Sequence, residues 1–472
     1  MGQPYRLFTQ ASVGYNASIF YRTFLPFNMF EKLGFPVDPI VDFGEADVPV
    51  NIRSAMVLES DITLAYQTFS QFRYEIMRQC KTLVPMKDHD GIVRWPATFV
   101  VDTDDDLFNV QPLNMTFGRF GIKDPTTGET LKDGDEIGIA HPLEVAPPET
   151  EAKLNKRYPS PITGARGSIG RKRFIFSSDG HWHAYFQLWQ DGRNIDIAKN
   201  RDALENWRRI MSVAQLITCS TPRVEQYVKR ELGPDAPTFV TPNAIDFDIY
   251  PDVELRDHPD EVRILWQGSA THHEDLWPLN DAIKRVAEKY PQTTWWFWGG
   301  PYKWAVENIP KGRGKLIPWV HQEAYVTRLS TMNHDINLAP LKPHIFNLSR
   351  SAIKWYESSA ICKPAVTLAQ KTGAYEDEIQ DNETGLLFGT PEEFELKLGG
   401  LIEDEMLRKR LASNAKDWVR TYRDARQVMT RLFGKYVEVR EGHKQTMPKP
   451  DEMTESASLA LTSTQEQHAV ST

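Results

Sequence analysis

The sequence predicts an α/β protein built from doubly wound parallel sheets. Short apolar runs typical of buried strands alternate with longer segments in which apolar residues recur at helical spacing. Several of the apolar runs end in glycine, as expected where a strand leads into a helix at the edge of a parallel sheet. With 472 residues, the chain is long enough for two or three domains of ordinary size.

The composition is that of a globular protein, with 40% hydrophobic and 25% charged residues. No apolar run approaches the ~20 residues that a membrane span requires, and the first residues lack a signal-peptide pattern. Three cysteines lie far apart without metal-binding spacing, which predicts reduced thiols in a cytoplasmic protein. A net charge of −9 argues against a surface that coats nucleic acid.

In the first half, strands and helices are expected to alternate. The expected strands are 5–10, 60–65, 97–101 and 215–218, and the expected helices are 21–33, 68–80, 198–213 and 222–232. Residues 115–172 interrupt this order because they are rich in Gly, Pro, Thr and charge. So long an irregular insertion is usually a lid or a binding segment. Its glycine-spaced basic end, 164–173, is either a contact for an anionic acceptor or a solvated hairpin.

The second half repeats the alternation. The expected strands are 262–267, 294–298, 335–341 and 365–368, and a helix is expected over 275–290. Small residues follow these strands: Gly268 and Ser269 the first, Gly299 the second and Gly373 the last. Glycine at such positions lets backbone approach a ligand closely.

The segment 347–364 carries the most specific pattern. Arg350, Lys354 and Glu357 stand at i, i+4 and i+7, which is one face of a helix that Asn347 or Ser349 would cap. Two cations at a helix N-terminus suit a diphosphate, and a carboxylate two turns along suits the paired hydroxyls of a ribose. The pattern therefore predicts a pocket for a nucleotide-diphosphate sugar, and the alternative is an amphipathic helix with a solvated basic face.

This segment resembles the donor-binding element of the retaining GT-B glycosyltransferases, in which a Glu-x7-Glu pattern opens the helix and a turn ending in Lys-Pro closes it. Glu357 matches the second Glu, Lys363 and Pro364 match the turn, and Ser349 replaces the first Glu. The replacement resembles a bacterial and phage subgroup that has Asn, two residues, Lys-Ser, then Lys and Glu, with Arg350 for the first Lys. The Gly-Ser-x-Thr-His-x-x-Asp-Leu run at 268–276 matches the same subgroup.

The resemblance implies a GT-B fold of two Rossmann-like domains. The acceptor-side domain would span 1–240, with the insertion at 115–172, and the nucleotide-sugar-binding domain 241–441. The polar residues 442–472 are expected to be disordered. No cofactor and no metal ion are expected. The implied donor-binding residues are Gly14, Gly268, Ser269, Gly299, Arg350, Ser351, Lys354, Glu357 and Gly373.

The candidate catalytic residues are Asp104, Asp105, Asp106 and His272. The three acids follow a buried strand, where doubly wound folds bind ligands. They suit a metal-binding Asp-x-Asp motif of the GT-A type, a metal-free acceptor-side group as in the GT-B subgroup, or a cap for the next helix. The donor pocket favours the second interpretation. A neutral His272, in a strand-to-helix turn, would hydrogen-bond the donor sugar or phosphate.

The predicted function is transfer of a hexosyl or pentosyl unit from a nucleotide sugar to a glycan or small molecule. One alternative is a phage-type enzyme that glycosylates a hydroxylated base in DNA, suggested by Arg166 and 171–173 and opposed by the net negative charge. The other is a non-catalytic protein that binds a nucleotide sugar or glycan, suggested by Ser349 in place of Glu.

Overall fold

The computed structural model contains two compact units, each of which is described by itself. The larger unit takes in residues 1–106, 205–269 and 275–472, and the smaller unit takes in 107–204 and 270–274. The structure describes residues 4–10, 17–42, 56–57, 59–87, 93–110, 116–123, 130, 140–162, 165–170, 172–176, 180–187, 196–256, 258–269, 272–300 and 302–447.

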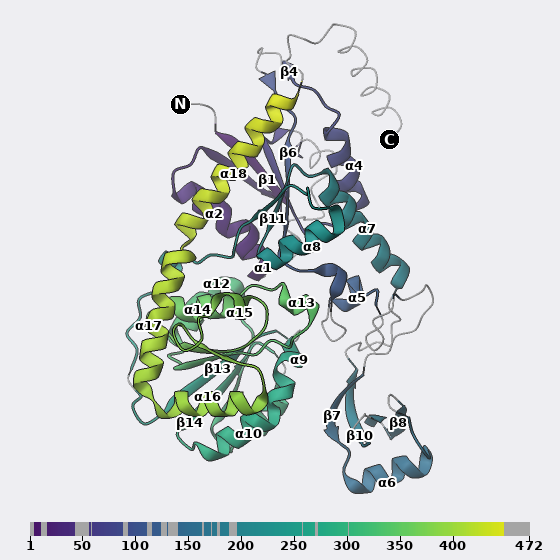
Figure 1. Ribbon diagram of the computed structural model, residues 1–472, viewed down its shortest axis with the longest axis vertical. Helices are drawn as coiled ribbons and strands as arrows, with labels where there is room; N and C mark the ends of the chain where they lie inside the picture. The colour runs from purple at the N-terminus through teal and green to yellow at the C-terminus, as the bar shows by residue number, and fades with distance from the viewer. Residues whose placement is uncertain are drawn as a thin grey trace. The chain divides into compact units, whose positions relative to one another are not determined.

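The N-terminal half of the larger unit is a six-stranded parallel sheet in the order β12-β11-β6-β3-β1-β2 (Figure 1). The strands are β1 (Tyr5–Gln10), β2 (Val37–Asp42), β3 (Ile62–Tyr66), β6 (Thr98–Thr103), β11 (Leu216–Cys219) and β12 (Thr238–Val240). The helices are α1 (Ala17–Ile19), a π-helix (Phe20–Phe24), α2 (Leu25–Lys32), α4 (Gln71–Cys80), α7 (Ile197–Val213) and α8 (Pro222–Leu232). The strand order reverses between β1 and β3, as in flavodoxin-like folds.

The C-terminal half of the larger unit is a second six-stranded parallel sheet in the order β15-β14-β13-β16-β17-β18. The strands are β13 (Val262–Gln267), β14 (Thr293–Trp298), β15 (Gly314–Ile317), β16 (Ile336–Ala339), β17 (Val366–Gln370) and β18 (Leu386–Phe388). The helices are α9 (His273–Leu276), α10 (Asn280–Lys289), α11 (Lys303–Glu307), α12 (Gln322–Thr331), α13 (Ile345–Leu348), α14 (Ile353–Ala360), α15 (Ala374–Glu378), α16 (Pro391–Glu403) and α17 (Glu405–Tyr422). This is the Rossmann strand order, which reverses between β13 and β16.

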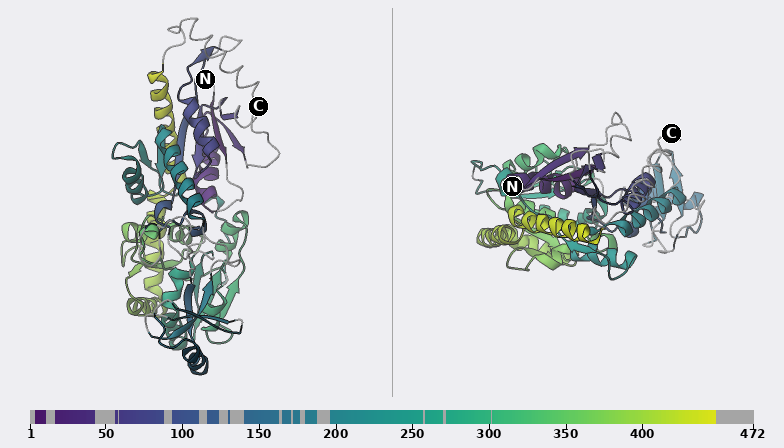
Figure 2. Two further views of the ribbon diagram at one scale, coloured as in Figure 1. Left: turned by 90° about the vertical axis from the view of Figure 1, so that its right-hand side faces the viewer. Right: turned by 90° about the horizontal axis from the view of Figure 1, so that it is seen from above.

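The last helix, α18 (Ala425–Thr446), follows the C-terminal sheet in sequence but packs on α2 and β6 of the N-terminal sheet (Figures 1 and 2). Phe433 stacks on Phe35 with ring centroids 4.4 Å apart. The guanidinium of Arg440, which is 1% exposed, pairs with Asp61 at 2.9 Å. One apolar cluster therefore joins residues of both halves.

The smaller unit contains a four-stranded antiparallel sheet in the order β7-β10-β9-β8. Its elements are α5 (Phe117–Phe120), β7 (Ala140–Val145), α6 (Pro148–Arg157), β8 (Arg166–Ile169), β9 (Lys172–Phe176) and β10 (Trp182–Gln187). Leu154, Phe174 and Trp182 form a small core, and the Trp182 indole donates to Asn155 at 2.8 Å. The insertion is thus more regular than the sequence predicted.

The predicted fold class is confirmed by the two six-stranded parallel sheets with helices on their faces. The expected strand 5–10 and helix 222–232 match β1 and α8 residue for residue. α8 is well defined locally because Thr221 Oγ1 accepts from the Val224 amide at 3.1 Å and Gly233 ends the helix with φ of 104°. The domain boundaries stay a prediction.

Several expected elements need correction. The helix over 275–290 is interrupted by a 3₁₀ turn at Trp277–Leu279, which contains a proline. The helix over 21–33 begins with the π-helix before α2. The tail expected to be disordered from 442 is helical through Thr446, because α18 continues to that residue; residues 448–472 lie outside the described residues. Among the described residues, no helix combines the length and apolar character that a bilayer crossing requires.

Candidate functional site

The carboxyl edge of the C-terminal sheet forms the floor of the candidate donor site. The Gly268 amide donates to the Trp298 carbonyl at 3.0 Å, which joins the turns after β13 and β14. Gly299 has φ of 100°, and a Cβ there would lie 3.0 Å from the Gly268 carbonyl oxygen. Ser269 is exposed, and its carbonyl accepts from the Tyr302 hydroxyl. Gly299 is therefore needed first for close packing of these two turns.

The segment 345–360 does not form the single helix that the sequence predicted. It forms two short helices, α13 and α14, and α14 begins only at Ile353 after Ala352. Neither Asn347 nor Ser349 caps α14, and instead His344 Nδ1 accepts from the Phe346 amide at 3.2 Å to cap α13. Arg350 and Ser351 thus lie in the connection between the helices.

The two predicted cations remain near each other across this connection. Lys354 stands in the first turn of α14, and its Nζ lies 5.5 Å from the Trp266 ring centroid in β13. Burial lowers the pKa of Lys354 to about 8, although the Asp275 carboxylate acts in the opposite direction. The Arg350 side chain is 28% exposed and its Nε lies 3.7 Å from Asp105 Oδ1. Lys354 therefore lies beside β13, next to the strand-order reversal, whereas Arg350 faces the acidic run that follows β6.

Glu357 is 4% exposed and bonded to two tyrosines. Its Oε1 accepts from the Tyr21 hydroxyl at 2.7 Å, and its Oε2 accepts from the Tyr325 hydroxyl at 2.6 Å. Burial raises the pKa of Glu357 to about 7, even though both hydrogen bonds favour the charged form. The sequence did not identify Tyr21 and Tyr325 as site residues, because no local pattern marks a residue that contacts Glu357 from a distant part of the chain.

The acidic run after β6 divides into carboxylates with different surroundings. Asp102 pairs with Arg22 through two bonds of 2.8 and 2.6 Å, and both side chains are buried. Asp104 accepts from Tyr66 at 2.9 Å and Gln67 at 2.6 Å. Burial, together with the negative charge of Asp105, raises the pKa of Asp104 to about 7.

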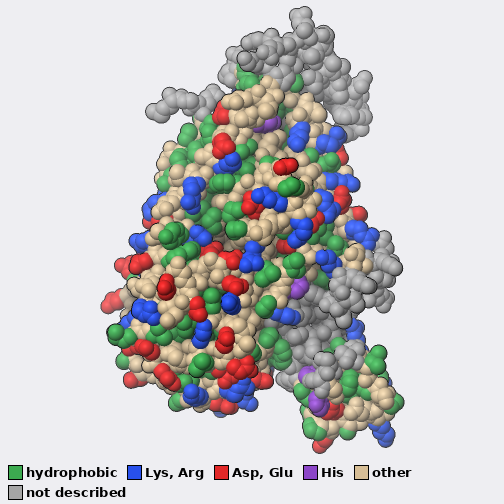
Figure 3. All heavy atoms as spheres, viewed as in Figure 1, with side chains coloured by type: hydrophobic (Ala, Val, Ile, Leu, Met, Phe, Trp, Pro, Cys, Tyr) green, Lys and Arg blue, Asp and Glu red, His purple; other side chains and the backbone are tan. Residues whose placement is uncertain are grey.

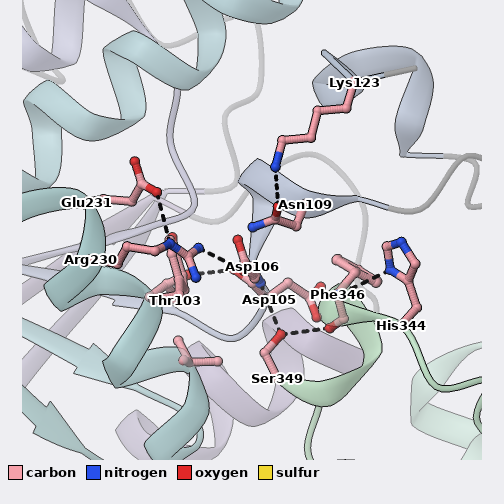
Figure 4. Close-up of polar contacts among 12 residues, drawn as sticks. Thr103, Asp105, Asp106, Asn109, Lys123, Arg230, Glu231, His344, Phe346 and Ser349 are labelled. Carbon is pink, nitrogen blue, oxygen red and sulfur yellow. Dashed lines mark hydrogen bonds and ion pairs between the residues drawn. The ribbon is translucent and has the colours of Figure 1, made fainter. Parts of the chain in front are cut away.

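The other two acids of this run meet the segment that precedes α14 (Figure 4). Asp105, 21% exposed, is the acid that faces Arg350. The Asp106 carboxylate accepts from Arg230 at 3.1 Å, and its amide donates to Ser349 Oγ at 3.3 Å. Ser349 Oγ in turn donates to the Phe346 carbonyl at 2.8 Å. Ser349, which stands where the GT-B pattern has its first Glu, therefore joins the acidic run to α13.

The remaining predicted residues lie elsewhere. Ser351 Oγ accepts from Asn243 Nδ2 at 2.9 Å. Gly373 has φ of 54°, and a Cβ there would come within 2.6 Å of the Leu348 carbonyl oxygen, so this glycine permits close packing on α13. His272 is buried and belongs to the smaller unit. Gly14 lies outside the described residues.

Asp275 is a buried residue near the predicted cations that the sequence analysis gave no role. Its Oδ1 accepts from the Lys342 amide at 2.9 Å and from Asn347 Nδ2 at 3.1 Å. It stands in the Asp-Leu pair that ends the 268–276 run, so that run was a signal for it. The carboxylate orders the loop between β16 and α13 and partly balances Lys354.

In the part of the chain that the structure describes, no group of three or more His, Cys, Asp or Glu is arranged to hold a metal ion. Independence of metal stays a prediction.

No protein-family model matches the chain, and no match is found among curated protein sequences. Solved structures with a similar fold include HepE of Anabaena with UDP and glucose (TM-score 0.53, 11% identity, 92% of this chain and 100% of that one). A second is the sucrose-phosphate synthase of Thermosynechococcus elongatus (TM-score 0.53, 10% identity, 92% of this chain and 99% of that one). A third is a glycosyltransferase of Rickettsia africae (TM-score 0.54, 10% identity, 92% of this chain and 98% of that one). The chain thus has the two-domain fold of the GT-B glycosyltransferases, as predicted.

Proposed function

We propose that the protein is a glycosyltransferase that moves a sugar from a nucleotide-diphosphate sugar to a glycan or small-molecule acceptor, with retention at the anomeric carbon and without a metal ion. The observation that supports this most is that the segment 350–357 meets the acidic run that follows β6, with Arg350 Nε 3.7 Å from Asp105 Oδ1, and that titratable groups of both have shifted pKa values. Lys354 has a pKa of about 8, and Glu357 and Asp104 have a pKa of about 7. Such shifts are typical of functional sites.

Arg350, Lys354, Glu357 and Asp105 each have a role in the proposed reaction. Arg350 and Lys354 stabilise the negative charge that grows on the leaving diphosphate as the glycosidic bond breaks. Glu357 accepts hydrogen bonds from the ribose hydroxyls. Among the acids of the β6 run, Asp105 is the one that combines partial exposure with proximity to Arg350, so it is best placed to align the acceptor.

The structures of HepE contain UDP with glucose or UDP-glucose, which makes a UDP-sugar the first donor to test. The test is incubation with a panel of nucleotide sugars, read by mass spectrometry for nucleoside diphosphate and for sugar transfer or hydrolysis. We expect release of nucleoside diphosphate from at least one of these nucleotide sugars. Failure to release nucleoside diphosphate from any donor, with every plausible acceptor class present, would contradict the proposal.

The alternatives have less support. On the face drawn in Figure 3, basic and acidic side chains are interspersed, which does not favour a DNA-binding surface there. Of the basic run proposed for DNA, Arg171 lies outside the described residues, and the side chains of Lys172 and Arg173 are not described. The DNA-modifying enzyme and the non-catalytic binding protein stay predictions.

The proposed site predicts a bell-shaped pH dependence of kcat/KM for the donor. Below pH of about 7 the Glu357 carboxylate takes up a proton and no longer binds the ribose as an anion, and above about 8 the Lys354 ammonium loses its proton. Activity should therefore fall on both sides of this window. Because arginine stays charged, Lys354→Arg should move the alkaline limb to higher pH. An alkaline limb that is the same in wild type and Lys354→Arg would show that Lys354 does not set it.

The proposal also predicts that activity survives removal of divalent ions. Transfer or donor hydrolysis should change less than about twofold in excess EDTA, because the two cations and not a metal stabilise the diphosphate. Loss of activity in EDTA that manganese restores would instead identify the acidic run after β6 as a metal site of the GT-A type.

A further inference from the structure

The carboxylate of Glu357, which is proposed to bind the ribose, already accepts hydrogen bonds from two hydroxyl groups of the protein itself. Tyr21 and Tyr325 donate to its two oxygens, and Tyr21 is 3% exposed while Glu357 is 4% exposed. A ribose offers the same chemistry, a pair of hydroxyl donors. With so little of Glu357 accessible, a ribose cannot reach it unless one tyrosine leaves.

The two tyrosines come from different halves of the larger unit. Tyr325 belongs to α12 in the same half as Glu357, bonds Gln267 at 2.8 Å and stacks on Trp298 with ring centroids 5.0 Å apart. Tyr21 comes from the N-terminal half and stands in the π-helix, a rare conformation that is often found at functional sites. Tyr21 is therefore the tyrosine that can leave without breaking the donor half.

Groups of the N-terminal half also reach the candidate diphosphate site. The Asp105 carboxylate, which is proposed to align the acceptor, lies 3.7 Å from the Arg350 guanidinium. Asn243, in the linker after β12, bonds Ser351 at 2.9 Å. Groups of the N-terminal half thus meet Glu357 and Arg350, two of the predicted donor-binding residues.

We propose that Tyr21 is an autoinhibitory residue that occupies the ribose position on Glu357, and that a nucleotide sugar binds only as Tyr21 is displaced. This inference rests on the proposed function. It couples donor binding to displacement of Tyr21, because the hydroxyl of Tyr21 and those of the ribose compete for one carboxylate. The competition lowers the apparent affinity for nucleotide by the fraction of molecules in which the contact is closed.

The test is calorimetric titration of wild type and Tyr21→Phe with UDP, GDP and ADP. Removing the hydroxyl deletes a hydrogen bond to a charged group and should tighten binding of the preferred nucleotide about 10-fold or more. Tyr5→Phe is the matched control, since the Tyr5 hydroxyl also donates to a carboxylate, Glu441 at 3.2 Å, away from this site. Tyr5→Phe should bind the nucleotide as wild type does.

Equal or weaker binding by Tyr21→Phe, with binding by wild type, would overturn the inference and leave the proposed function standing. Absence of binding by both proteins would overturn the two together. Hydrogen exchange of the wild type decides the matter if Tyr21→Phe does not fold. The amides of residues 17–24 should exchange faster when the nucleotide is added, and unchanged or slower exchange would contradict displacement of Tyr21.

Discussion

Replacing Lys354 with alanine is expected to lower kcat for sugar transfer about 100- to 1,000-fold, the usual cost of removing one group that stabilises transition-state charge. The Lys354 ammonium is partly buried beside Trp266, where screening by water is weaker than at the surface. Its interaction with the leaving diphosphate is therefore stronger than that of an exposed lysine. The rate is measured at saturating donor, with circular dichroism to show that the variant is folded.

Lys409→Ala is the control for this experiment. Lys409 lies in α17 of the same half, is 72% exposed and pairs with Glu405 at 2.6 Å. Its replacement should leave kcat unchanged, because it lies on an exposed helix and pairs with a neighbour one turn away. Similar rates for Lys354→Ala and Lys409→Ala would show that Lys354 has no part in transfer.

Replacing Asp102 with alanine is expected to destabilise the protein by about 3–5 kcal/mol, because it leaves the buried Arg22 without its counter-ion. The two side chains are 4% and 3% exposed, and Arg22 also donates to the Thr241 carbonyl at 2.6 Å. The pair thus joins the π-helix, β6 and the linker after β12. The decrease in the free energy of unfolding is measured by urea denaturation monitored by tryptophan fluorescence.

Asp377→Ala is the matched control for this prediction. Asp377 also binds an arginine, Arg223, through two bonds of 2.7 and 2.8 Å, but the side chains are 43% and 33% exposed. Exposed pairs contribute about 0–1 kcal/mol, so this variant should unfold close to wild type. Equal decreases in the free energy of unfolding for the two variants would mean that burial does not determine how much the Asp102–Arg22 pair stabilises the protein.

The sequence was most informative where structure is set locally. The apolar spacing and the Thr221 cap determine α8 within a few residues, so its bounds could be predicted. The two sheets followed from the alternation of strands and helices. Residues 345–360 were harder, because Asn347 and Ser349 are good capping residues whose side chains form other contacts, with Asp275 and with the Phe346 carbonyl.

The candidate site could be predicted only in part, for a related reason. The sequence identified the acidic run after β6 but not which acids are bound elsewhere in the fold. Asp102 is paired with Arg22 and Asp106 with Arg230, residues far away in the sequence. Tyr21 gave no signal, since it contacts Glu357 across 336 positions of the chain. Such contacts depend on how the two sheets pack, which local spacing does not encode.

We infer that the segment from Arg350 to Glu357 binds the nucleoside diphosphate of a sugar donor. Calorimetric titration of wild type and of the Arg350→Ala, Lys354→Ala double variant with UDP, GDP and ADP tests it most directly. We predict one saturable site in the wild type for at least one nucleotide, and an affinity at least 100-fold lower in the folded double variant, because each charged contact contributes about 1.5–3 kcal/mol. Equal affinities in the two proteins would contradict the claim.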